Sequence, residues 1–372
     1  MKTRFPSLAI AVLGVLAVAG FASAQTAWAE TIVDSGITAD TTWTLDGSPY
    51  RVVIPNVVVF QDVTLTIDPG VQVIFDGIDT LDIRGHLNAI GTDPAPITFT
   101  PSAENPDQTW QGISVNTNLG GSLNLQHTEL SSAKIAVFTT CCNSGGPLSI
   151  QDSVFRNNTK ALAGYSGSTL LVVKRSLFEN NHIAVTGGDK NIYDSTFTNN
   201  EYGLYQTERI NVFHSTFTGN TSAAVYGGRG VVENSLIENN GTGIQGFYEG
   251  FTVSQSTIRN NDVGVIMTEY GAYRPPITYN TITGNTVWNV QVIGPSNAHL
   301  ENNWWGATDE NAILDTIEDG RDNGISGLAL IDPFQLRPFN VELAPRVRGN
   351  TTLSVPAVLG EPFALLRREV LR

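Results

Sequence analysis

The sequence predicts an all-β solenoid, in which short parallel strands stack into coils of about 22 residues. Three observations predict this fold class. A polar motif recurs along the chain at a nearly constant spacing, apolar residues hold fixed positions relative to it, and an Asn follows it in a regular column. Helical solenoids are excluded, because no repeat carries an apolar stripe with the period of a helix.

The recurring motif has the form x-x-Ser-x-Phe/Ile-x-Asn-Asn, and its Ser serves as the reference position. Clear copies occupy residues 151–158, 174–181, 193–200, 213–220, 233–240, 254–261 and 278–285. Weaker copies place the reference at Thr128 and Asn302. Successive reference positions are therefore 19 to 25 residues apart.

Apolar side chains hold three positions in each repeat. One set lies three residues before the reference, from Ile150 to Ile277, and another lies nine residues after it, from Leu162 to Val265 and including Ala224. Polar or variable residues flank these positions, and such alternation marks a strand with one buried face. Each repeat is thus predicted to hold three short strands separated by bends. The set two residues after the reference is Phe155, Phe178, Phe197, Phe217, Ile237, Ile258 and Ile282.

An Asn stands five residues after the reference in seven consecutive copies. Asn tolerates left-handed backbone angles and bonds to the local backbone, which suits a sharp bend. At the strand spacing of about 4.8 Å, stacked amides can hydrogen-bond along the column. We therefore expect a structural role for this column, which consists of Asn158, Asn181, Asn200, Asn220, Asn240, Asn261 and Asn285.

On these motifs the sequence resembles the right-handed parallel β-helix repeat family, a pectate-lyase-like superfamily with secreted bacterial surface-type members. The phrases at 65–71 and 87–92 resemble the opening coils of such proteins, and the phrase at 301–306 resembles their closing coil. The resemblance implies a single-stranded right-handed parallel β-helix with caps at both ends. The best-known members degrade pectin. The repeat itself, however, predicts the architecture and does not define an activity.

The chain is expected to divide into five segments. An exposed end of the solenoid would leave unpaired strand edges, so caps are required. A short helix within 308–319 is expected in the second cap, and Trp304 is expected to end the core stack. The segments are a signal peptide at 1–24, an N-terminal cap at 25–50, the β-helix at 51–306, a C-terminal cap at 307–339 and a loosely ordered tail at 340–372.

The first segment predicts export. Lys2 and Arg4 precede an apolar run, and Ala22-Ser23-Ala24 provides a cleavage site, so a secreted, extracellular or periplasmic location is expected. Removing residues 1–24 leaves 19 Lys and Arg against 35 Asp and Glu, a balance that argues against a nucleic-acid partner. No later run is long and apolar enough to span a membrane.

The neighbouring cysteines Cys141 and Cys142 leave three states open: reduced thiols, a vicinal disulfide or an intermolecular bond. The oligomeric state is also left open.

One edge of the predicted solenoid concentrates aromatic and charged residues, in the variable stretch after the third strand of each repeat. Aromatic faces stack on sugar rings, and carboxylates and guanidinium groups bind hydroxyls or uronic acids. We therefore expect a non-catalytic scaffold that binds a polysaccharide or another surface ligand; the plain alternative is that these residues only decorate loops. The predicted ligand-binding residues are Tyr205, Glu208, Arg209, Tyr226, Arg229, Tyr248, Tyr270 and Arg274.

The alternative function is that of a polysaccharide lyase or glycoside hydrolase. Glu249 and Glu269 on adjacent coils would lie about 5 Å apart, within the range of retaining glycosidases. The sequence motifs of polygalacturonases and pectate lyases are missing, however. No cofactor is expected and the histidines do not cluster; only the acidic segment 315–322 leaves calcium open. An ice-binding Thr array is interrupted by Arg156 and Glu179.

Overall fold

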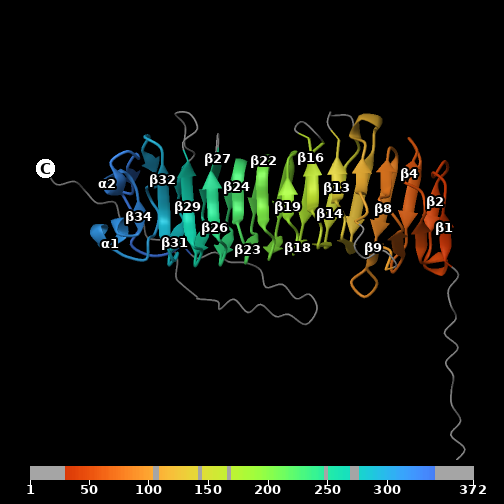
Figure 1. Ribbon diagram of the computed structural model, residues 1–372, viewed down its shortest axis with the longest axis horizontal. Coiled ribbons are helices and arrows are strands. Elements are labelled where there is room, and N and C mark those ends of the chain that lie inside the picture. Colours follow the sequence, from red (N-terminus) through yellow and green to blue (C-terminus); the bar gives the residue numbers. More distant parts are fainter. Residues whose placement is uncertain are drawn as a thin grey trace, which may run out of the picture.

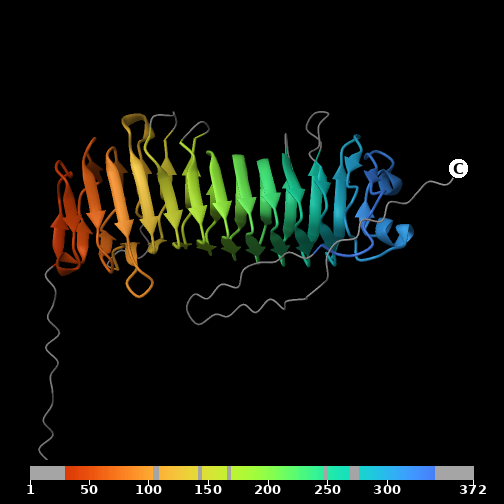
Figure 2. The same cartoon turned by 180° about the vertical axis from the view of Figure 1, so that it is seen from behind.

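The computed structural model describes residues 30–103, 109–140, 145–165, 169–246, 250–268 and 276–339. These residues form a right-handed parallel β-helix of about twelve turns, which confirms the predicted fold class. Figure 1 shows an elongated rod whose coils follow one another along the long axis in sequence order, and Figure 2 shows the same rod from behind. Each full coil contributes one strand to each of three faces.

The first face carries the motif strands, each of which pairs in parallel with the strand one coil away. Its strands are short because a bend follows the motif at once. They are β1 (Thr31–Val33), β3 (Tyr50–Val52), β6 (Gln72–Phe75), β9 (Ile97–Pro101), β12 (Thr128–Ser131), β15 (Val154–Arg156), β18 (Leu177–Glu179), β21 (Thr196–Thr198), β23 (Thr216–Thr218), β25 (Leu236–Glu238), β28 (Thr257–Arg259) and β31 (Thr281–Thr283).

The second face follows the Asn bend. It consists of β4 (Asn56–Val59), β7 (Thr80–Ile83), β10 (Gly112–Val115), β13 (Ile135–Thr139), β16 (Lys160–Gly164), β19 (Ile183–Thr186), the N-terminal parts of β22 (Tyr202–Phe213) and β24 (Ala223–Glu233), β26 (Thr242–Gly246), β29 (Val263–Thr268), β32 (Trp288–Ile293) and β34 (Ile317–Glu318).

The third face completes each coil. Its strands are β2 (Thr41–Trp43), β5 (Thr64–Ile67), β8 (His86–Ile90), β11 (Ser122–Gln126), β14 (Leu148–Gln151), β17 (Leu171–Lys174), β20 (Lys190–Tyr193), the C-terminal parts of β22 and β24, β27 (Gly250–Ser254) and β30 (Ile277–Thr278). Because β22 and β24 run through two faces, they join the second and third faces into one sheet.

The predicted inward positions form the core. Phe155, Phe178, Phe197 and Phe217 are fully buried, and neighbouring rings stack with centroids 4.5–5.1 Å apart. This spacing follows from the strand separation, so each ring covers the face of the next. The set nine residues after the reference is also buried, including Ala224. The residue that pairs with Leu204 is Val225 rather than Ala224, because the bend before β24 holds one extra residue.

The two Asn residues at the end of each motif have separate roles. The second Asn forms the predicted ladder, in which each Nδ2 donates to the Oδ1 of the next Asn at 2.8–3.0 Å. The left-handed backbone angle was expected at this residue, but it belongs to the residue before it. Asn157, Asn180, Asn199, Asn239 and Asn260 have φ of 54–58°, and Gly takes the same position at 219 and 284.

The Ser of the motif forms a second buried ladder. Its hydroxyl donates to the carbonyl two residues earlier, and it accepts a hydrogen bond from the backbone N–H of the preceding coil's reference residue. In the last copies Asn280 and Asn303 replace Ser in this role, with Asn280 N donating to Asn303 Oδ1 at 2.8 Å. The last reference position is therefore Asn303 rather than Asn302. Consequently Trp305, not Trp304, enters the core, where it is 2% exposed.

Strand pairing continues outside 51–306 at both ends. β1, in the segment expected to form the N-terminal cap, pairs with β3, and β34, in the segment 307–339, pairs with β32. The expected helix is shorter, because α1 (Glu310–Leu314) ends before Ile317 joins β34.

The remaining elements are short. They are the 3₁₀ helices η1 (Leu45–Gly47) and η2 (Thr117–Leu119), the helix α2 (Gly320–Asn323), and the pair β33 (Ala298–His299) and β35 (Ala329–Leu330). Figure 1 places α1 and α2 at the C-terminal end of the rod. Within the described ranges, no helix is long and apolar enough to cross a membrane.

Candidate functional site

Two of the predicted ligand-binding tyrosines meet on the second face. Tyr205 of β22 and Tyr226 of β24 are paired in register, next to Leu204 and Val225, which face the core. Because side chains alternate along a strand, both tyrosines point outward. Their rings are parallel, with an interplanar angle of 4° and centroids 5.2 Å apart.

A third ring joins this pair, that of Tyr202, which was not among the predicted ligand-binding residues. Its centroid lies 4.8 Å from that of Tyr205 and 5.3 Å from that of Tyr226, and it is inclined by 63° to both. All three side chains remain partly exposed. The next residue, Gly203, has no Cβ because one would lie 2.9 Å from the Phe217 ring, so the backbone here is pressed against the core. Tyr202, Tyr205 and Tyr226 are called the tyrosine cluster below.

A histidine–carboxylate pair lies beside the cluster on the side of the Asn bend. His182 Nδ1 is 2.6 Å from Glu201 Oε2, and both side chains are about half exposed. The His182 ring meets the Tyr202 ring edge-on, with centroids 6.3 Å apart. This edge of the cluster therefore offers a carboxylate and an imidazole to solvent.

The predicted charged residues lie at the opposite edge, in the bend between the second and third faces. Arg209 binds Asp189 through two contacts, of 2.8 Å from Nη2 and 3.2 Å from Nε. Glu208 is partly exposed beside it, and Arg229 lies one coil further, paired in register with Gly250. The structure thus places the predicted tyrosines on a face and the predicted charges in the adjoining bend.

The remaining predicted site residues lie outside the described residues, as do both cysteines, the expected signal peptide and the expected tail. These site residues are Tyr248, Tyr270, Arg274, Glu249 and Glu269.

The geometry of the cluster limits how a ligand can use it. Tyr205 and Tyr226 each cover one face of the other, so the outer face of Tyr205 is the ring surface of this pair that a ligand can stack on. The register puts Thr186 beside the outer face of Tyr205 and Gln245 beside that of Tyr226. A ring-shaped ligand can therefore pack over Thr186, while the phenol edge of Tyr205 offers a hydroxyl group that both donates and accepts hydrogen bonds.

The third face carries a second outward aromatic pair. The Tyr193 and Phe213 rings stack at 5.3 Å, and Lys174 Nζ lies 6.0 Å from the Tyr193 centroid. Beside them, Asn211 Nδ2 donates to Asn191 Oδ1 at 3.0 Å. This pair has no third aromatic ring in contact with it among the described residues, so it provides a comparison for the tyrosine cluster.

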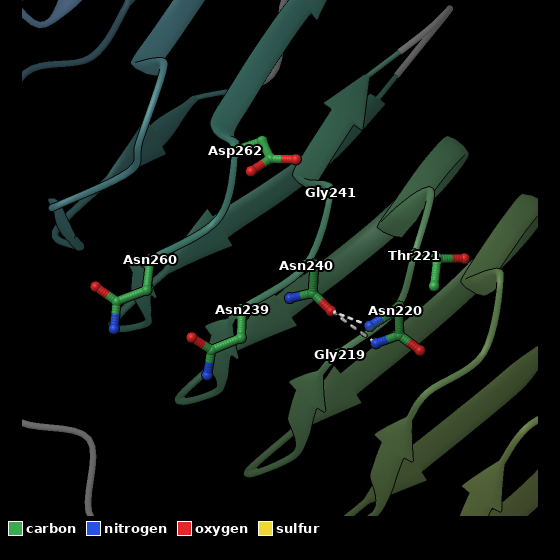
Figure 3. A pocket seen from close by; sticks show the side chains of 8 residues that line it. All are labelled: Gly219, Asn220, Thr221, Asn239, Asn240, Gly241, Asn260 and Asp262. Atoms are coloured by element: carbon green, nitrogen blue, oxygen red, sulfur yellow. Dashed lines mark hydrogen bonds between the residues drawn. The ribbon is translucent and has the colours of Figure 1, made fainter.

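A shallow polar depression of about 400 Å³ follows the outer side of the Asn ladder (Figure 3). The ladder amides and the carboxylate in its lining already have partners: Asn240 Oδ1 accepts from Asn220 Nδ2 at 2.8 Å, and Asp262 Oδ1 accepts from Thr286 Oγ1 at 3.2 Å. We therefore assign this depression to the scaffold. It is lined by Gly219, Asn220, Thr221, Asn239, Asn240, Gly241, Asn260 and Asp262.

Within the acidic segment 315–322, Asp319 and Asp322 form a capping box at the start of α2. Asp319 accepts hydrogen bonds from the N–H groups of Arg321 and Ala329, both at 2.8 Å, and Asp322 accepts from Asp319 N at 2.9 Å. Within the described ranges, no three His, Cys, Asp or Glu side chains are grouped as metal ligands would be.

The match to a protein-family model agrees with the architecture. Residues 204–325 match the family model described as a right handed beta helix region. Among solved structures, the chain is similar to a mutant of the periplasmic alginate epimerase AlgG, with 15% sequence identity and a TM-score of 0.39 over 81% of this chain and 83% of that chain. No curated protein matches the chain significantly. The family match identifies a scaffold rather than an activity.

Proposed function

We propose that this protein is an exported scaffold that binds a carbohydrate at the tyrosine cluster. The observation that carries the proposal is the contact of three partly exposed tyrosine rings on two successive coils. Large aromatic side chains that face outward on a rigid sheet lose little conformational entropy when a ligand packs on them. The surrounding scaffold is a hydrogen-bonded rod, so the rings are held in place before the ligand arrives.

The flanking groups define the chemistry of the ligand. Carboxylates of Glu201 and Glu208 accept hydrogen bonds from hydroxyls, and the guanidinium of Arg209 donates to them. The chain has a formal net charge of −14, which disfavours association with a strongly anionic polymer. A neutral glycan with an apolar ring face therefore fits the cluster best.

A glycan array tests binding, and a combined reducing-sugar and unsaturated-product assay on the same panel tests turnover. The expected result is binding without product. Tyr226→Ala should weaken binding about tenfold or more, because it removes the ring that packs against Tyr202 and Tyr205 and holds the cluster in place. Tyr193→Ala is the matched control, since it removes an outward, stacked aromatic from another face and should leave affinity unchanged.

Three outcomes would contradict the proposal. Product that forms in the wild-type protein and is abolished by Glu249→Gln or Glu269→Gln would assign an enzyme instead. Equal losses in Tyr226→Ala and Tyr193→Ala, or no binding to any glycan, would remove the tyrosine cluster as the site.

Export is the part of the proposal that rests on the N-terminal sequence alone. Cell fractionation should find a processed chain outside the cytoplasm, and a full-length cytoplasmic precursor would contradict it.

A further inference from the structure

The outward side of the first face carries an uncharged stripe. It is formed by the residue that precedes each inward Phe or Ile, and its members face away from the core. In coils that are open to solvent, such residues stay partly exposed, as Thr196 and Thr216 do. The stripe consists of Val154, Leu177, Thr196, Thr216, Leu236, Thr257 and Thr281.

Burial of this stripe changes towards the C-terminal end of the rod. Leu236 is 5% exposed, Thr257 is 8% exposed and Thr281 is 5% exposed. Their inward neighbours are fully buried on the other side of the same strands. The core therefore cannot account for the burial of these three side chains, and something outside the sheet must cover them.

The described chain leads to this stripe at its last residues. Gln335 N donates to Asn303 O at 2.9 Å, on the last coil. Four residues later, Phe339 N donates to Thr281 Oγ1 at 2.8 Å, and this hydroxyl donates to Phe339 O at 3.1 Å. The Phe339 ring also meets the Tyr279 ring edge-on, with centroids 6.2 Å apart. Residues 335–339 thus run from the last coil back towards earlier coils.

We propose that the C-terminal segment from Asn340 onwards docks along this stripe and covers Thr257 and Leu236. Leu236 lies two coils beyond Thr281, or about 10 Å at the strand spacing. An extended chain advances about 3.3 Å per residue, so three or four residues bridge this distance. The proposal is independent of the glycan site, which lies on another face.

The sequence that follows Phe339 suits this role. Val341 and Leu343 alternate with Glu342, so an extended chain would turn two apolar side chains to one side. Residues 340–372 also contain five Arg against three Glu, whereas the whole chain is strongly acidic. The apolar side chains of this segment suit the uncharged stripe, and the positive charge of its remaining residues suits the acidic rod.

Thiol labelling tests the proposal in a Cys141→Ser, Cys142→Ser background. Leu236→Cys in the full chain should react with a charged maleimide at least tenfold more slowly than Thr196→Cys, its matched control on the same stripe. Truncation after Phe339 should raise the rate at Leu236→Cys to that of the control and leave Thr196→Cys unchanged. Equal rates in the full chain, or protection that survives truncation, would overturn the proposal.

Truncation could expose Leu236→Cys simply by destabilising the fold, and a point variant in the full chain controls for this effect. Leu343→Asp in the full chain should also expose Leu236→Cys, while Thr351→Asp should not, and both variants should keep the thermal midpoint of the parent. Protection of Leu236→Cys that falls on dilution would assign the cover to a second copy of the chain and would overturn an intramolecular segment.

Discussion

Lys190 occupies an inward position of the third face, where the neighbouring coils carry Leu171 and Ile210. It is only 1% exposed. Its ammonium donates to the carbonyl of Thr186 at 3.2 Å and to that of Gly187. These carbonyls lie in the bend between the second and third faces, so the lysine stem fills the core while its amine satisfies the backbone of the bend.

Burial lowers the pKa of Lys190 from 10.5 to about 7, although the nearby Asp189 opposes the shift. Between these two pH values the unfolded chain binds more protons than the folded chain, so the free energy of unfolding should rise with pH across this window. The total rise is of the order of 5 kcal/mol. Lys190→Met should remove this dependence.

The measurement is the urea midpoint at pH 6, 7.5 and 9. Wild-type protein should gain stability across the series relative to Lys190→Met. Lys174→Met, which removes an exposed lysine from the same face, should follow the wild-type curve. Parallel curves for wild type and Lys190→Met would show that the amine is not titrating in the core.

The two Asn residues at the end of each motif contribute differently to the free energy of unfolding. Asn240 accepts two hydrogen bonds from Asn220 and donates to Asn261 Oδ1, Phe217 O and Glu238 O. Asn240→Ala leaves several of these buried groups unpaired, so it should cost about 2–5 kcal/mol of unfolding free energy.

Asn239 is exposed and has φ of 58°. Asn239→Gly keeps this angle accessible and should therefore cost under about 1 kcal/mol. Chemical denaturation of both variants compares a buried amide with an exposed one on adjacent residues. Similar losses would mean that the ladder contributes little.

At the scale of the element, the first-face strands owe their stability to what they place inward. Phe197 of β21 is fully buried between Phe178 and Phe217, with ring centroids 4.9 and 4.5 Å away. Phe197→Ala removes a ring from the middle of the stack and should cost about 3–5 kcal/mol.

Thr198→Ala on the outward side of the same strand is the control and should cost under about 1 kcal/mol. Thermal and urea unfolding measure both variants. A loss for Thr198→Ala that matched the loss for Phe197→Ala would mean that the inward face of β21 does not dominate its stability.

The periodicity of single strands made most of these assignments possible. Alternation within each motif predicts which residues face inward, and the recurring Asn predicts the bend. The spacing could not reveal that β22 and β24 continue through two faces, so Tyr205 and Arg209 were expected on one edge and instead lie on a face and in a bend. A column alignment on the Asn bend would have found Tyr202, which lies in register with Ile183 and Ala223.

At the scale of the whole molecule, each coil contacts mainly the coils above and below it. Local sequence could therefore predict the solenoid over most of its length. It was less informative at the C-terminal end, where the tandem Trp304-Trp305 allowed two registers, which contacts between coils such as the hydrogen bond from Asn280 to Asn303 distinguish. The tyrosine cluster likewise depends on contacts between coils, which a single repeat does not contain.

The same nearest-neighbour logic predicts that one coil can be removed. Ser195 and Ser215 occupy equivalent positions in the Ser ladder, and Asp194 and His214 before them have φ of 48° and 49°. Deletion of residues 195–214 therefore joins equivalent backbone conformations. It would bring Phe178 against Phe217 and Asn181 against Asn220, so each stack of equivalent side chains should re-form across the junction.

The shortened chain should fold, with a β-rich circular dichroism spectrum, a cooperative melt and a rod about 4.8 Å shorter by small-angle scattering. It loses Tyr202 and Tyr205 but keeps Tyr226, so glycan binding should fall while the scaffold persists. Deletion of 195–204 alone is the control, because it removes half a coil and brings Tyr205 to the Ser position, which should prevent folding. If both deletions unfolded the protein, coils would not be interchangeable units of stability, since a register-preserving cut would then be as harmful as one that breaks the register.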